Sequence, residues 1–122
     1  VWPTEPEGDP LRLFLRSIDD FAGLPADTLV LPSHGLPFRG ARHRIRMLHD
    51  HHRDRLAEVL EFCAGPATAA ELMPVLFRRP LDLHQAFFAM GEAIAHLHYL
   101  WYQGRLSRSR DGGIYRFTRR PS

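Results

Sequence analysis

Histidines offer most of the chemistry in this chain, which has eight of them, a single cysteine and no lysine. His34 lies in the loop of residues 32–37, directly after the apolar run of residues 28–31. A neutral imidazole at the end of a strand suits a zinc ion at about 2.0–2.1 Å. A catalytic zinc needs about three protein ligands and a water molecule, so His34 alone cannot form such a site. On its own, a single loop histidine is more often only a loop residue.

A second group of histidines follows at positions 49, 51 and 52. On a helix, His49 and His52 share a face at i,i+3, whereas His51 points elsewhere. That spacing permits a metal site, but Asp50 and Asp54 are offset from the shared face. We therefore favour a polar surface on which His52 is partly packed. His49 and His52 are candidates for substrate-entrance or surface contacts.

Two more histidines lie near the end of the chain, at positions 96 and 98. Glu92 and His96 form an i,i+4 pair, which predicts a structural hydrogen bond that orients the imidazole. His98 lies about 200° around a helix from His96, so these two side chains cannot chelate one ion.

Arginines with interleaved aromatic residues dominate the C-terminal segment. The arginines are Arg105, Arg108, Arg110, Arg116, Arg119 and Arg120. A winged helix often binds DNA through its third helix and wing, but residues 81–104 contain no arginine or lysine. A recognition helix without these residues reads a major groove poorly. We expect a solvated face or a docking surface instead, with Arg105 and Arg108 as candidate contacts.

The first 40 residues predict an extended linker, a helix and a strand. Asp9 and Pro10 suit the N-cap and first position of the helix. Its apolar face consists of Leu11, Phe14, Leu15, Ile18 and Phe21. Residues 28–31 predict a strand buried on both faces. This unit has no sheet to join, so we expect residues 1–40 to close an α/β domain whose remainder lies upstream in the same protein. Left unpaired, the unit should self-associate, for example as a homodimer, or swap its N-terminal segment. The winged helix from about residue 42 onward should be monomeric.

Residues 41–122 predict a winged helix. A long helix over residues 41–63 is followed by capping boxes at Thr68 and Asp82, each of which starts a helix. Pro74 predicts a kink or a short, irregular element. The core face expected for the third helix is Phe87, Met90, Ile94, Leu97 and Trp101. Strands over residues 105–109 and 114–119 flank a turn at Asp111-Gly112-Gly113. The fold class is thus α+β and mostly helical.

Several segments resemble metallo-β-lactamase-fold hydrolases, in the branch of β-lactamase-like proteins and glyoxalase II. Pro32-Ser33-His34-Gly35-Leu36-Pro37 resembles their P-G-H-G-x-P loop. The segment Ala-Met-Gly-Glu-Ala-Ile-Ala-His-Leu, residues 89–97, resembles the A-x-x-E-x-x-A-H-L helix of their winged-helix extension. Residues 51–56 and 65–68 fit the same pattern. Ser33 departs from the usual glycine, and the H-x-H-x-D-H metal motif is absent.

The resemblance implies a function for a larger parent protein. In that family the histidine at the position of His34 is the last ligand of a two-zinc site, so the parent would be a metal-dependent hydrolase. The winged helix would shape the active-site entrance for a small ester, thioester or phosphodiester. This chain would not fully bind the zinc ions and would be inactive alone. The alternative is a stand-alone nucleic-acid-binding winged helix that uses its basic wing.

Composition narrows the class of protein. The 122 residues are 44% hydrophobic and 25% charged, as in ordinary globular domains. No apolar run approaches the roughly 20 residues of a membrane span, and no secretion leader is visible. Together with the lone Cys63, this predicts a cytoplasmic protein. The net charge of +2 is too small to indicate nucleic acid binding.

Overall fold

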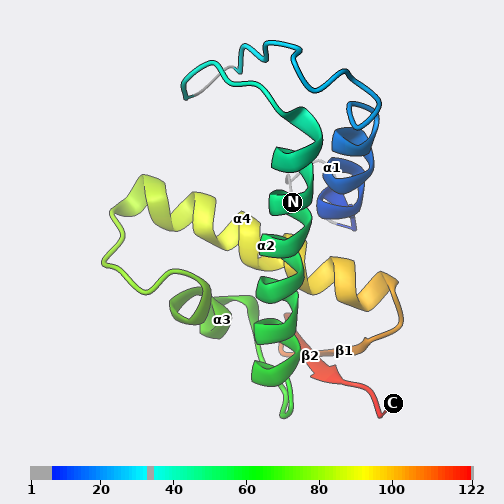
Figure 1. Cartoon of the computed structure of the whole chain (residues 1–122). Helices are drawn as coiled ribbons and strands as arrows, with labels where there is room; N and C mark the ends of the chain where they lie inside the picture. Colours follow the sequence, from blue (N-terminus) through cyan, green and yellow to red (C-terminus); the bar gives the residue numbers. More distant parts are fainter. Residues whose placement is uncertain (1–6, 33–34, 122) are drawn as a thin grey trace.

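The computed structural model describes residues 7–32 and 35–121 and is mostly helical, with one antiparallel hairpin. The elements are α1 (Pro10–Asp19), α2 (Ala41–Phe62), α3 (Ala69–Leu76), α4 (Leu83–Tyr102), β1 (Leu106–Asp111) and β2 (Ile114–Arg119). In Figure 1, α2 and α4 cross, α1 lies beside the first half of α2, and the hairpin lies near the end of α2. The predicted fold class, α+β and mostly helical, is confirmed.

The starts of α3 and α4 are fixed by the two predicted capping boxes. The Glu71 amide donates to Thr68 Oγ1 at 3.2 Å, and the Thr68 amide donates to Glu71 Oε1 at 2.9 Å. Asp82 and Gln85 exchange the same pair of hydrogen bonds at 2.8 and 3.1 Å. Each box satisfies two helix N–H groups that have no partner within the helix. Pro74 lies inside α3, which has only eight residues.

The apolar face of α1 packs against helices that follow residue 41. Leu11 and Leu15 are buried against Ala95 of α4, and Ile18 is packed at the edge of the same cluster. Phe14 and Phe21 remain 42% and 56% exposed. The face therefore finds an intramolecular partner over part of its length. The division of the chain near residue 40 stays a prediction.

The predicted strand at residues 28–31 is wrong. Only Val30 pairs: its amide donates to the Phe38 carbonyl at 2.7 Å, and the Phe38 amide donates back at 3.0 Å. Leu29 and Leu31 are 48% and 74% exposed. A strand buried on both faces needs neighbours in a sheet, and no other strand flanks this run in the described part of the chain.

The hairpin closes the main core. Gly112 and Gly113 form its two-residue turn with φ of +58° and +80°, the left-handed values that a type I′ turn requires. Asp111 pairs with Ile114 and therefore belongs to β1, which ends two residues beyond the predicted strand. Ala67, between α2 and α3, adds a bridge to Phe117 of β2. The largest fully buried side chains of this core are Leu72, Leu97, Leu106, Val59 and Cys63.

The predicted core face of α4 is only partly right. Leu97 is fully buried, but Phe87 and Phe88 are 70% and 64% exposed. The buried residues are instead Ala89, Ala93, Ala95, His96, Leu97, His98 and Leu100. Ala93 lies in the core shared with α3, whereas Ala95 packs against α1. Because α4 is buried on several sides, periodicity does not define one inner face.

Candidate functional site

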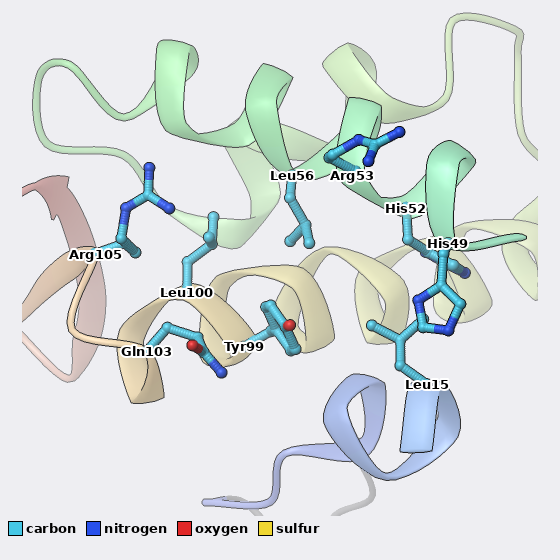
Figure 2. Close-up of a pocket in the computed structure, with 9 residues that line it drawn as sticks. All are labelled: Leu15, His49, His52, Arg53, Leu56, Tyr99, Leu100, Gln103 and Arg105. Carbon is cyan, nitrogen blue, oxygen red and sulfur yellow. The ribbon is translucent and has the colours of Figure 1, made fainter. Parts of the chain in front are cut away.

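A pocket of about 310 Å³ lies between α1, α2 and α4 (Figure 2). It is lined by Leu15, His49, His52, Arg53, Leu56, Tyr99, Leu100, Gln103 and Arg105. Three of the four predicted entrance contacts, His49, His52 and Arg105, meet here although Arg105 follows His49 by more than fifty residues. The fourth, Arg108, does not line the pocket.

The pocket has an apolar floor and polar walls. Leu15 of α1, Leu56 of α2 and Leu100 of α4 supply the apolar surface. Figure 2 shows Tyr99, Leu100 and Gln103 following one another along α4, with Leu56 reaching toward them from α2. Tyr99 and Gln103 were not among the predicted site residues. The available signal was two polar-tipped side chains at i,i+4, which share one face near the end of the helix.

His49 anchors α2 to the end of α1. Its Nε2 lies 2.7 Å from Oδ1 of Asp19. Since a carboxylate accepts, the Nε2–H of His49 donates in this contact. Both side chains are at the surface, so the interaction is partly screened by solvent.

His52 is partly packed, as predicted, and stacks near His96. Their ring centroids lie 5.7 Å apart, and Phe14 lies 5.7 Å from His52 in an edge-to-face arrangement. Burial lowers the pKa of His52 from 6.5 to about 4, with smaller effects from the neighbouring imidazoles of His96, His51 and His49. His52 is therefore neutral at neutral pH.

His96 is held in one tautomer. Its Nδ1 lies 2.7 Å from the backbone carbonyl oxygen of Glu92, which can only accept, so Nδ1 carries the proton. The predicted partner residue is confirmed, but the acceptor is the backbone rather than the carboxylate. Burial lowers the pKa of His96. A second pocket, of about 200 Å³, is lined by both imidazoles together with His51 and Phe88.

The described residues do not fit a zinc site. Within residues 7–32 and 35–121, no group of three or more His, Cys, Asp or Glu side chains is placed to hold a metal ion. His49 and His52 share a pocket, but His49 already binds Asp19. His34, the predicted zinc ligand, lies outside the described residues.

Arg108 is partly buried in a contact that the sequence did not reveal. Its guanidinium carbon lies 3.8 Å from the Trp101 ring centroid and 4.0 Å from that of Tyr115. Its Nη1 donates to Oε2 of Glu7 at 3.0 Å. Arg108 is therefore a structural residue that ties the hairpin to the segment before α1.

Two residues of α4 hold the same segment. His98 Nδ1–H donates to the Gly8 carbonyl at 2.9 Å, and the Tyr102 hydroxyl donates to the Glu7 carbonyl. Burial lowers the pKa of His98. We call His98, Tyr102 and Arg108 with Glu7 and Gly8 the N-terminal clamp.

None of the helices in the described part of the chain combines the length and apolarity needed to cross a membrane.

The comparisons with known proteins agree on one family. Residues 56–120 match the family model of the metallo-beta-lactamase-like C-terminal domain. A beta-lactamase domain protein from Burkholderia ambifaria is 50% identical in sequence and superposes with a TM-score of 0.94, over 98% of this chain and 36% of that protein. A metallo-beta-lactamase family protein from Thermus thermophilus is 39% identical with a TM-score of 0.78, over 92% of this chain and 34% of that protein.

No curated protein sequence matches the chain. The chain spans about a third of the length of the two solved structures. Since the family model covers more than half of its residues, the chain belongs to the metallo-β-lactamase-like family and carries that family's C-terminal domain.

Proposed function

We propose that this chain is the C-terminal part of a zinc-dependent hydrolase of the metallo-β-lactamase fold, in which it shapes the active-site entrance and selects the substrate. The pocket between α1, α2 and α4 is the observation that carries this proposal. It joins an apolar floor to the basic and polar groups His49, Arg53 and Arg105. Such a mixture is typical of small-molecule sites.

The order of elements supports a winged helix for residues 41–122. The helices α2, α3 and α4 are followed by the β1–β2 hairpin. Ala67, which lies between α2 and α3, pairs with Phe117 of β2. The wing is then the β1–β2 hairpin.

Catalysis would depend on the rest of the protein. The resemblance of the loop around His34 to the family's metal-binding loop supports a role for His34 as one zinc ligand, with the others supplied from outside this chain. Zinc would polarise the scissile group and lower the pKa of a bound water. The substrate class is a small ester, thioester or phosphodiester.

Kinetics of the full-length enzyme that contains this chain test the proposal. His34→Ala should abolish turnover of the best substrate in a panel of esters, thioesters and phosphodiesters and lower the zinc content. Tyr99→Phe and Arg105→Gln should raise KM with a smaller change in kcat, because they would remove binding rather than chemistry. His84→Ala, on the exposed start of α4, is the matched control. Full turnover after His34→Ala would overturn the metal assignment.

The nucleic-acid alternative is weakened by the contacts of the wing. Arg108 is bound by Glu7, and Arg116 lies 3.7 Å from Asp111. If the chain nevertheless binds nucleic acid through phosphates, its affinity should fall steeply as the salt concentration rises. Tight, salt-dependent binding of DNA or RNA by the chain would therefore favour the alternative.

A further inference from the structure

We propose that the pocket between α1, α2 and α4 binds an anionic head group, a carboxylate or phosphate, carried on a short apolar stem. This deepens the proposed function, on which it rests for the identification of that group as part of the substrate. Binding of the head group itself depends on the pocket residues, all of which belong to this chain.

Arg105 supplies the uncompensated positive charge. Within the described residues, its guanidinium makes no hydrogen bond or ion pair. The other arginine of the pocket, Arg53, is bound to Asp50 at 2.5 Å. A free guanidinium beside a pocket favours carboxylate or phosphate, whose paired oxygens match its fork of donors.

Tyr99 and Gln103 add two neutral donors on the same side of α4. In the part of the chain that is described, neither side chain has a hydrogen-bond partner. They lie at i,i+4 and line the pocket beside Arg105. A hydroxyl, an amide and a guanidinium around one cavity offer a head group several hydrogen bonds at once.

Two carboxylates near the pocket already have partners. The carboxylates of Asp19 and Asp50 contact His49 and Arg53. The carbonyls at the end of α4 also have partners: the amides of Gln103, Gly104 and Arg105 donate to the carbonyls of Tyr99, Trp101 and Leu100 at 2.9–3.0 Å. These three carbonyl groups therefore do not present unpaired oxygens to an incoming anion.

The apolar side chains that line the pocket indicate what kind of stem the ligand should carry. Leu15, Leu56 and Leu100 present aliphatic carbon from three different helices. The volume of about 310 Å³ lies at the small end of the usual range for ligand pockets, about 300–1,000 Å³. A chain of a few carbons suits this space better than a bulky ring system.

Titration calorimetry and NMR shift mapping of the 122-residue chain test the inference. The probes are hexanoate and hexyl phosphate, with hexanol and inorganic phosphate as partial ligands. At least one of the two amphipathic anions should bind at the pocket residues, about tenfold or more tightly than either partial ligand. The tighter of the two identifies the head group. If hexanol binds as tightly as the anions, the anionic head group is overturned. If neither anion binds, the site itself is overturned.

Charge-matched variants separate the site from general surface charge. Arg105→Gln should weaken binding about tenfold, the scale of one charge-assisted interaction, and Arg105→Lys should restore part of the loss. Arg119→Gln removes the same charge from an exposed position on β2 and should change nothing. Equal losses in Arg105→Gln and Arg119→Gln would overturn the proposal. Because no turnover is measured, this failure is independent of the hydrolase test.

Discussion

The imidazole rings of His52 and His96 lie 5.7 Å apart, one on α2 and one on α4, where the two helices pack. Nδ1 of His52 and Nε2 of His96 are buried there without a hydrogen-bond partner among the described residues. Since burial disfavours the charged form, both rings pack as neutral groups. The contact between α2 and α4 therefore depends on protonation.

The stability of the chain should fall in mildly acidic solution. The pKa of His52 is 6.5 in ordinary surroundings and about 4 in the folded chain. Between these values the unfolded chain binds more protons, so the free energy of unfolding decreases as the pH falls through this window. His96, whose pKa is also lowered, acts in the same direction. Because part of the His52 ring is in solvent, its share should be about 2 kcal/mol rather than the full value of the shift.

Urea unfolding at pH 7 and pH 4.5 measures this effect. His52→Asn should reduce the difference between the two pH values, whereas His84→Asn, at an exposed position on α4, should preserve it. An identical difference in His52→Asn and the unsubstituted chain would show that His52 does not carry the dependence.

Truncations on α4 should show which residues of its predicted core face contribute to the core. Leu97→Ala should lower the free energy of unfolding by about 2–5 kcal/mol, because Leu97 is fully buried and leaves a cavity. Phe87→Ala should change it by less than about 0.5 kcal/mol, since Phe87 is 70% exposed. Thermal or urea unfolding measures both. A loss in Phe87→Ala as large as that in Leu97→Ala would place Phe87 in the core, as periodicity predicts.

Local chemistry explains which elements were predictable. The capping boxes at Thr68 and Asp82 and the turn at Gly112-Gly113 each depend on residues within a few positions, so the sequence alone predicts them. The inner face of α4 and the run at residues 28–31 depend on which partner surfaces exist. Hydrophobic periodicity contains no information about those surfaces. The predicted inner face of α4 was therefore partly wrong, and the predicted strand at residues 28–31 was wrong.

The candidate site shows the same limit. Residue type and helix spacing pointed to His49, His52 and Arg105, but their meeting in one pocket requires the packing of α1, α2 and α4. Arg108, by contrast, was expected on a solvated face or docking surface, but the structure places it in contacts with Glu7 and Trp101. Its partners Glu7 and Trp101 lie on separate segments, so no spacing rule pairs them with it.

The N-terminal clamp should contribute measurably to stability. Arg108→Ala removes the contacts with Trp101, Tyr115 and Glu7 and should lower the free energy of unfolding by about 1–2 kcal/mol. Arg110→Ala is the matched control, since Arg110 is exposed and 5.6 Å from the Tyr115 centroid. Urea denaturation compares the variants, and equal effects would show that the clamp adds no stability.

Zinc should bind the 122-residue chain weakly or not at all. The resemblance supplies a single ligand, His34, and a structural site needs about four. Dialysis followed by elemental analysis measures the bound metal, with a chelator-treated sample as the control. One tightly held zinc per chain would contradict this expectation and direct mutagenesis to His49 and His52.

The chain should self-associate through the apolar residues that α1 and the following loop leave exposed. Phe14, Phe21 and Leu31 are 42%, 56% and 74% exposed, whereas Leu11 and Leu15 are covered by α4. Burying such a side chain is worth about 1.5–3 kcal/mol, so a second copy that covers this surface would gain stability. Sedimentation velocity at rising concentration should show a dimer, and Phe21→Ser should weaken it. Leu83→Ser, at a 90% exposed position on α4, should not. A monomer at every concentration would mean that the packing of Leu11 and Leu15 against α4 is enough to keep the chain monomeric.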